Sequence, residues 1–128
     1  MTGREVVLWL PFDKPPLTAN QRMHWAPRSR LTKRVRMAAR ALAGVAGLPR
    51  ALPRVRVGLA YFPRDNRRRD ADNLVPTLKA ACDGLVDYGL VRDDTPDQME
   101  KGMPVIHPAH KEGPGPRGER VALVVTLP

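Results

Sequence analysis

Residues 67–94, RRRDADNLVPTLKAACDGLVDYGLVRDD, hold most of the recognisable chemistry of this chain and its best-defined helical pattern. The stretch opens with three arginines, Arg67, Arg68 and Arg69. Asp70 and Asp72 follow, and side chains two residues apart leave the same side of an extended backbone. That spacing suits one metal ion. A second acidic pair, Asp93 and Asp94, closes the stretch.

Between the two acidic pairs, apolar residues recur at helical spacing and predict a helix from about residue 75 to residue 88. Its apolar stripe consists of Leu74, Leu78, Ala81, Cys82 and Leu85. Pro76 is acceptable in the first turn, and Asp72 or Asn73 can cap the helix. Lys79 projects near the start of the helix, where a cation could stabilise charge on a phosphate or protonate a leaving oxygen. The alternative is a plain exposed lysine.

Three carboxylates are candidate ligands of one metal site. Asp70, Asp72 and Asp94 carry the oxygen ligands that Mg2+ prefers, and Mn2+ can take the same place. Such ions activate water and neutralise charge during phosphodiester hydrolysis; helix capping alone is the alternative role of Asp72. The predicted helix advances about 21 Å, and residues 89–94 span at most roughly 20 Å. The three meet only if residues 90 and 91 run back along the helix, or if Asp94 comes from another subunit.

The rest of the chain predicts a sheet and a second helix. The helix runs from residue 29 to about residue 47, and its apolar face is expected to comprise Leu31, Val35, Ala38, Leu42 and Val45. Strands are predicted at residues 5–10, 54–62, 98–106 and 121–127. We therefore expect one domain over residues 1–128 of the α/β (α+β) class, with two main helices on a mixed sheet of about four strands.

The charge of the chain favours a polyanionic partner. Lys and Arg total 22 against 13 Asp and Glu, which gives a formal net charge of +9, and nucleic acid is the first candidate. Arg67, Arg68 and Arg69 would draw a phosphate backbone towards the acidic residues that follow them. Arg30 and Lys33, at the start of the first predicted helix, are further candidates for DNA contact. A solvated basic face is the alternative for both groups.

Composition also indicates the compartment. Cys82 is the single cysteine, so no intramolecular disulfide can form, and no paired-cysteine zinc pattern occurs. The apolar run at residues 6–10 is too short for a signal peptide, and no segment approaches the length of a membrane span. We expect a cytoplasmic protein with no membrane partner.

Two segments resemble the signature of a known family. RRRDADNL and KAACDGLVDYGLVRDD are similar to the RusA family of Holliday junction resolvases, in which a basic run leads into Asp-x-Asp-Asn, a lysine follows on a helix, and a glycine turn precedes an Asp-Asp pair. The early loop with ANQRMHW supports the likeness. One departure concerns the lysine, which in bacterial members lies four residues after the second aspartate. Here Pro76 holds that place and Lys79 comes three residues later, within about 60° of the same helical face.

The resemblance implies a small homodimeric, Mg2+-dependent endonuclease, bacterial or phage-encoded, that resolves four-way DNA junctions by paired nicks during recombination and repair. It assigns metal binding to Asp70, Asp72 and Asp94, and the essential lysine to Lys79. The choice of Asp94 over its neighbour Asp93 rests on this motif alone. Two alternatives remain. One is a basic DNA-binding protein without catalysis, and the other is a nuclease with broader action on flaps and branched DNA.

Overall fold

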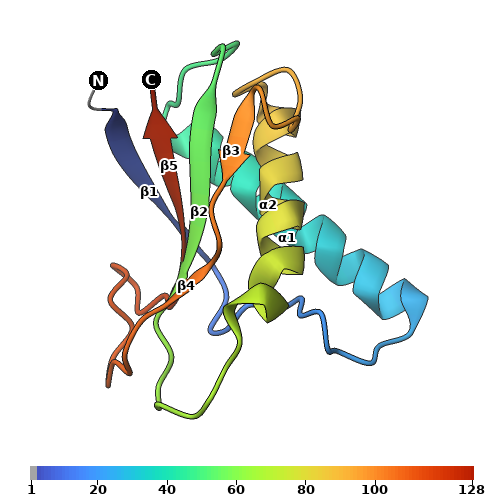
Figure 1. The fold of residues 1–128 in the computed structure, drawn as a ribbon, viewed down its shortest axis with the longest axis vertical. Helices are drawn as coiled ribbons and strands as arrows, with labels where there is room; N and C mark the ends of the chain where they lie inside the picture. Colours follow the sequence, from blue (N-terminus) through green and yellow to red (C-terminus); the bar gives the residue numbers. More distant parts are fainter. Residues whose placement is uncertain (1–2) are drawn as a thin grey trace.

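Alternating apolar residues build the strands of one mixed β-sheet in the computed structural model, which describes residues 3–128. The strand β5 (Val121–Leu127) lies between β1 (Arg4–Leu10) and β2 (Val55–Tyr61) and pairs antiparallel with both. Two short strands, β3 (Met99–Lys101) and β4 (Val105–Ile106), pair parallel with β2 (Figure 1). The predicted α+β class is confirmed, with five strands in place of about four.

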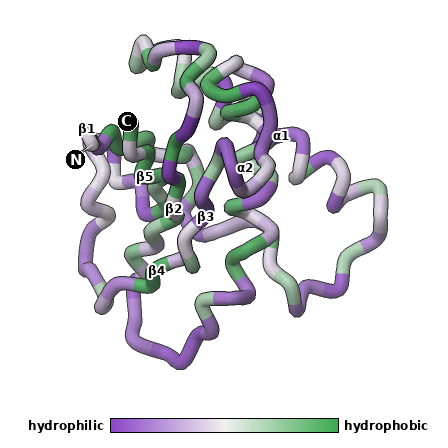
Figure 2. Tube along the Cα trace, turned by 45° about the horizontal axis from the view of Figure 1, so that its top comes forward, coloured by the Kyte–Doolittle hydropathy of each residue, from purple (hydrophilic) through white to green (hydrophobic). Residues whose placement is uncertain are grey.

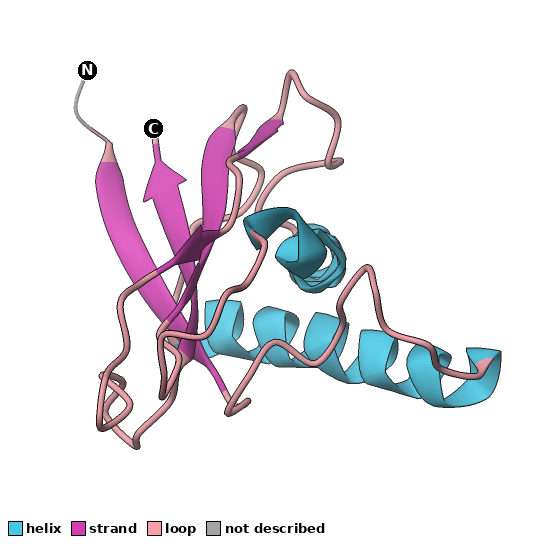
Figure 3. Cartoon of the chain, turned by 60° about the horizontal axis from the view of Figure 1, so that its bottom comes forward, coloured by secondary structure: helices cyan, strands magenta, loops and turns pink. Residues whose placement is uncertain are grey.

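Three helical elements complete the fold: α1 (Trp25–Val45), the short 3-10 helix η1 (Ala71–Leu74) and α2 (Val75–Tyr88). Both long helices lie on one side of the sheet, and the N-terminal part of α1 projects beyond it (Figure 3). The expected two layers of helix and sheet are therefore present. Among residues 3–128, no helix is long and apolar enough to cross a membrane.

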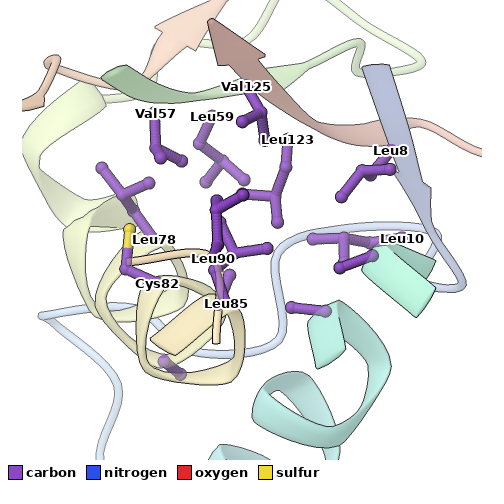
Figure 4. Close-up of a cluster of buried hydrophobic side chains, with 14 of the residues drawn as sticks. Leu8, Leu10, Val57, Leu59, Leu78, Cys82, Leu85, Leu90, Leu123 and Val125 are labelled. Atoms are coloured by element: carbon purple, nitrogen blue, oxygen red, sulfur yellow. The ribbon is translucent and has the colours of Figure 1, made fainter. Parts of the chain in front are cut away.

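The core lies between the sheet and the helices. Val57, Leu59, Leu123 and Val125 point from the two central strands towards the helices and meet Leu78 and Leu85 of α2 and Leu90, which follows it (Figure 4). All seven are buried. The predicted apolar stripe of α2 is confirmed, because all five of its members are buried. Burial also raises the pKa of the Cys82 thiol to about 12, so this cysteine packs as a core residue.

The two long helices cross at a glycine. A Cβ atom added to Gly84 of α2 would lie 2.1 Å from the Arg36 carbonyl oxygen and 3.0 Å from the Ala39 Cβ of α1. Only a residue without a side chain permits this approach. The close approach at Gly84 thereby fixes the two helices against each other.

Several sequence predictions of element bounds were wrong. Helix α1 begins at Trp25, four residues before the predicted start, since Pro27 is tolerated in a first turn. Its buried residues are Val35, Ala39 and Ala43, whereas Val45 is 87% exposed at the end of the helix. The strand predicted at residues 98–106 is divided into β3 and β4 by the segment that contains Gly102 and Pro104, because proline has no N–H for the ladder.

Candidate functional site

The segment at residues 62–70 joins β2 to η1 and is almost wholly hydrophilic in Figure 2. Within it, Asp65 accepts hydrogen bonds from Arg67 Nη2 at 3.1 Å and from Arg69 Nη2 at 2.9 Å. These bonds, the one from the Arg67 side chain first, hold the pKa of Asp65 well below its usual range. Asp65 therefore orders two of the three predicted DNA-binding arginines.

Arg69 is the most constrained of the three. Its Nη1 atom donates to the carbonyl oxygens of Asp65 at 3.0 Å and Arg67 at 3.1 Å. Its guanidinium carbon lies 5.7 Å from the ring centroid of Tyr61, at the end of β2. Its side chain is only 20% exposed. The guanidinium of Arg69 is thus a fixed, flat cation.

Arg68 differs from its two neighbours. It is exposed, and within residues 3–128 it forms no ion pair. Together with Arg69 and Asp70 it lines a hollow of about 380 Å3. Its positive charge is therefore available to an anionic ligand at the edge of that hollow.

A buried arginine anchors the start of this segment. Arg120, at 2% exposure, donates from Nη1 to the carbonyl oxygens of Phe62 at 3.0 Å and His110 at 2.9 Å, and from Nη2 to that of Lys111 at 3.0 Å. The residue that precedes β5 thus ties the segment at 62–70 to the loop between β4 and β5. Asn66 adds a second link, because its Oδ1 atom accepts from the Ala109 N–H at 2.8 Å.

Asp70 and Asp72 lie where this segment enters the helices. Asp70 has an extended backbone (φ −101°, ψ 126°), and its carbonyl oxygen accepts from the Asn73 N–H at 3.1 Å. Asp72 lies inside η1, so the prediction that both side chains leave one side of an extended backbone was wrong. Both residues are exposed, and within residues 3–128 neither forms an ion pair.

The capping prediction for α2 was also wrong. Leu74 occupies the N-cap position, and no side chain caps the helix. The 3-10 turn of η1 leads directly into α2 and takes the place of the predicted cap. The carboxylates of Asp70 and Asp72 are therefore not consumed by helix capping, which was the alternative role for Asp72.

Lys79 and Asp94 are in direct contact. Lys79 Nζ lies 2.5 Å from Asp94 Oδ2 and 2.8 Å from Asp83 Oδ1. Lys101 of β3 donates to the same Asp94 oxygen at 2.9 Å. The bonds to Asp83 and Asp94 raise the pKa of Lys79, and the two lysines, Lys79 first, lower the pKa of Asp94. We call Lys79, Asp83, Asp94 and Lys101 the lysine–aspartate cluster.

The chain reaches this cluster by the turn after α2. Gly89 adopts the left-handed conformation (φ 95°), which a residue without Cβ accepts at low cost. Leu90 and Val91 are then buried, and the Leu90 carbonyl oxygen accepts from the Leu52 N–H at 2.9 Å. The chain therefore runs back along α2 after Gly89, which is one of the two possibilities considered from the sequence. This return brings Asp94 into contact with Lys79.

The structure does not gather the three predicted carboxylates in one place. Asp70 and Asp72 lie where the chain enters α2, whereas the Asp94 carboxylate is held between Lys79 of α2 and Lys101 of β3. In the described part of the chain, no group of three or more His, Cys, Asp or Glu side chains could hold a metal ion. The candidate site therefore has two parts in one subunit, the Asp70–Asp72 pair and the lysine–aspartate cluster.

Arg30 and Lys33 are exposed in the N-terminal half of α1. The residues that sequence reasoning missed are Asp65, Arg120 and Lys101. Asp65 stands two residues before the arginine run, a local signal for pairing with it. Lys101 and Arg120 gave no signal, because their contacts depend on strand positions far along the chain.

Comparison with known proteins adds one relative. No family model matches the chain. An uncharacterized protein of Xylella fastidiosa (strain Temecula1) is 33% identical over 86 residues, which are 62% of this chain and 55% of that protein. The chain thus spans about half the length of this relative.

Proposed function

We propose that the protein is a Mg2+-dependent endodeoxyribonuclease of the RusA type that resolves four-way DNA junctions by paired nicks. One observation carries the proposal. Two exposed carboxylates, Asp70 and Asp72, have no ion-pair partner within residues 3–128 and directly follow three arginines, two of which are ordered. An acidic pair inside a basic surface suits a metal ion bound next to a phosphate backbone.

The donor chemistry of this pair fits Mg2+. This ion is usually held by one or two carboxylates and otherwise by water and substrate phosphate oxygens, so Asp70 and Asp72 suffice as protein ligands. Mn2+ accepts the same oxygen donors. When bound, the ion supplies an activated water and neutralises charge on the phosphate. The chain's own arginines position the DNA backbone, because Arg68 and Arg69 line the same hollow as Asp70.

Asp94 would be the third ligand only if it comes from a second subunit or if the chain rearranges. Its carboxylate is held by Lys79 and Lys101, and within residues 3–128 it does not form a group with Asp70 and Asp72 that could hold a metal ion. A homodimer with a two-fold axis would allow one subunit to supply Asp94 to the carboxylate pair of the other. Two such sites would suit a junction that has approximate two-fold symmetry.

Lys79 acts as a fixed positive charge in this proposal. Its hydrogen bonds to Asp83 and Asp94 raise its pKa, so it keeps its proton at neutral pH. A group with a raised pKa is a poor general acid, whereas a cation held by two carboxylates can stabilise charge on a transferring phosphate. Of the two roles that the sequence allowed, charge stabilisation is therefore the one we propose.

Non-catalytic binding of DNA is the second candidate. Two observations favour it: the net charge of +9, and the absence of a three-carboxylate group within residues 3–128. In that case the basic surface would bind phosphates and no strand would be cut.

Cleavage of defined DNA substrates decides between these functions. Purified protein is incubated with an end-labelled four-way junction, a 5′ flap and a linear duplex, each with and without Mg2+. The proposal predicts paired symmetrical nicks in the junction with Mg2+ and little cutting of the other two. Equal cutting of flap and junction would indicate a broader nuclease, and binding without cutting under Mg2+ or Mn2+ would indicate the DNA-binding protein.

A further inference from the structure

The hollow beside Asp70 has the size and lining of a ligand site. Its volume of about 380 Å3 falls in the range of small-molecule pockets. Part of its lining is apolar and buried, namely Pro15, Tyr61 and Leu74. The rest is polar or charged and comprises Lys14, Thr18, Asn20, Arg68, Arg69, Asp70 and Asn73. A bound phosphate alone would not need the apolar part.

One wall of the hollow is fixed before any ligand binds. The loop between β1 and α1 is tied to α2 by Thr77, whose Oγ1 atom donates to the Leu17 carbonyl oxygen at 2.7 Å and accepts from the Leu17 N–H at 3.1 Å. The Ala19 N–H donates to the Asn73 carbonyl oxygen at 3.0 Å. Asn20 follows directly on this anchored stretch and lines the hollow. The loop thus forms a preformed part of the lining, which it shares with the arginine segment.

The other wall carries a flat cation. Arg69 lines the hollow, and its guanidinium is held by Asp65 and by two carbonyl oxygens while it lies over Tyr61. Nucleobases stack on such guanidinium planes. Carboxamides donate and accept hydrogen bonds, which lets asparagine read the edge of a base. Asn20 and Asn73 are the residues of this type in the lining.

We propose that this hollow binds the base of one unpaired nucleotide next to the scissile phosphate and thereby sets the nucleotide preference of cleavage. Arg69 is the stacking surface, Asn20 and Asn73 read the base edge, and Lys14 and Arg68 bind the flanking phosphates. Taking a base out of its stack costs least where the base is already unpaired, so the hollow receives a base when the pairs at the centre of the junction open on binding. The inference rests on the proposed function, since it places the base beside the metal-binding carboxylates.

Two variants distinguish recognition of the base edge from electrostatic attraction of the phosphate backbone. Asn20→Ala removes a carboxamide from an exposed loop position. Lys14→Ala, at another exposed lining position, removes a phosphate contact and serves as the matched control. Loss of a base contact changes the preference among sequences, whereas loss of a phosphate contact weakens binding to all of them alike.

The first measurement needs no cleavage. A four-way junction carries 2-aminopurine at successive positions around its centre, and fluorescence is read at saturating protein in EDTA. We expect a rise at one position with wild type and with Lys14→Ala, and loss of that rise with Asn20→Ala. A rise of the same size in Asn20→Ala, or none at any position with wild type bound, would overturn the inference.

The second measurement is the cleavage preference over junctions that differ in the nucleotides at the centre. We expect Asn20→Ala to reduce the preference of wild type by roughly five- to tenfold, while Lys14→Ala keeps it. A wild type that cuts without preference would contradict the base site and leave the nuclease intact. A wild type that shows the Asn20-dependent fluorescence rise but never cuts would support the base site and overturn the nuclease. Failure to bind any junction would overturn both.

Discussion

Lys79 Nζ lies 2.5 Å from Asp94 Oδ2, although the two residues are 15 positions apart and belong to a helix and to the loop that follows it. Lys101 reaches the same oxygen from β3 at 2.9 Å. Helix, loop and sheet edge therefore share one small electrostatic cluster.

The cluster should stabilise the fold above about pH 4. The pKa of Asp94 is lowered in the folded chain from its ordinary value of 3.8, so its contribution is present above that value and is lost as pH falls further. Asp94→Asn should cost about 1 kcal/mol of unfolding free energy at pH 7, and the cost should shrink as the pH falls below about 4 and be much smaller at about pH 2. Urea unfolding at the two pH values measures the difference.

Asp97→Asn is the matched control for this prediction, because Asp97 is exposed and forms no ion pair within residues 3–128. Asp97→Asn should leave the free energy of unfolding nearly unchanged at both pH values. A cost for Asp94→Asn that stays the same at about pH 2 would show that the ion pairs are not its cause.

Gly84→Ala should destabilise the protein by about 2–3 kcal/mol, because the added methyl group meets the Arg36 carbonyl oxygen. Gly44→Ala should change the stability in the opposite direction. Gly44 lies in α1, where the nearest atom to an added Cβ is 3.8 Å away, so alanine should stabilise the helix by about 0.5–1 kcal/mol. Thermal unfolding of both variants tests the helix crossing.

Arg68→Ala should weaken junction binding roughly three- to tenfold and reduce the slope of log Kd against log salt by about 1. The reason is that Arg68 lines the hollow beside Asp70 and has no ion-pair partner among residues 3–128. Arg56→Ala removes an exposed arginine that pairs with Glu100, and it should leave the slope unchanged. Fluorescence anisotropy at several salt concentrations measures both.

Mixed subunits test whether Asp94 acts across a dimer. Asp70→Asn and Asp94→Asn should each be inactive. If Asp94 comes from the second subunit, half of the dimers in an equal mixture carry one intact site, so about a quarter of the sites are restored. Co-expression of two differently tagged variants, followed by junction nicking, measures this. An inactive mixed dimer would place Asp94 in the same subunit as Asp70, and an active Asp94→Asn variant would place Asp94 outside the site.

Local patterns in the sequence predicted much of this fold. The apolar alternation of Val55, Val57 and Leu59 and the helical spacing of Leu78 and Leu85 follow from one buried face each, and all five residues are in the core. The fold class, the two long helices and the sequence positions of the main strands could therefore be predicted, whereas the order of the strands in the sheet was not. Element ends were less predictable, because Pro27 and Pro104 permit more than one local outcome.

The site was less predictable than the fold because it depends on distant contacts. The proximity of Asp70, Asp72 and the arginines could be predicted, because these residues are neighbours in the chain. The sequence could not show that Lys101 would reach Asp94 from β3, or that a 3-10 turn would turn Asp72 away from an extended geometry. Those features follow from strand pairing and from the entry of the chain into α2.

The most direct test of the proposed nuclease is the separation of binding from cutting in Asp70→Asn. Wild type, Asp70→Asn and the control Asp97→Asn are compared on one end-labelled four-way junction, with a mobility-shift gel in EDTA and a denaturing gel after addition of Mg2+. The account predicts that all three bind the junction, while Asp70→Asn alone loses the paired nicks. Wild-type nicking by Asp70→Asn, or no nicking by wild type under Mg2+ or Mn2+, would contradict it.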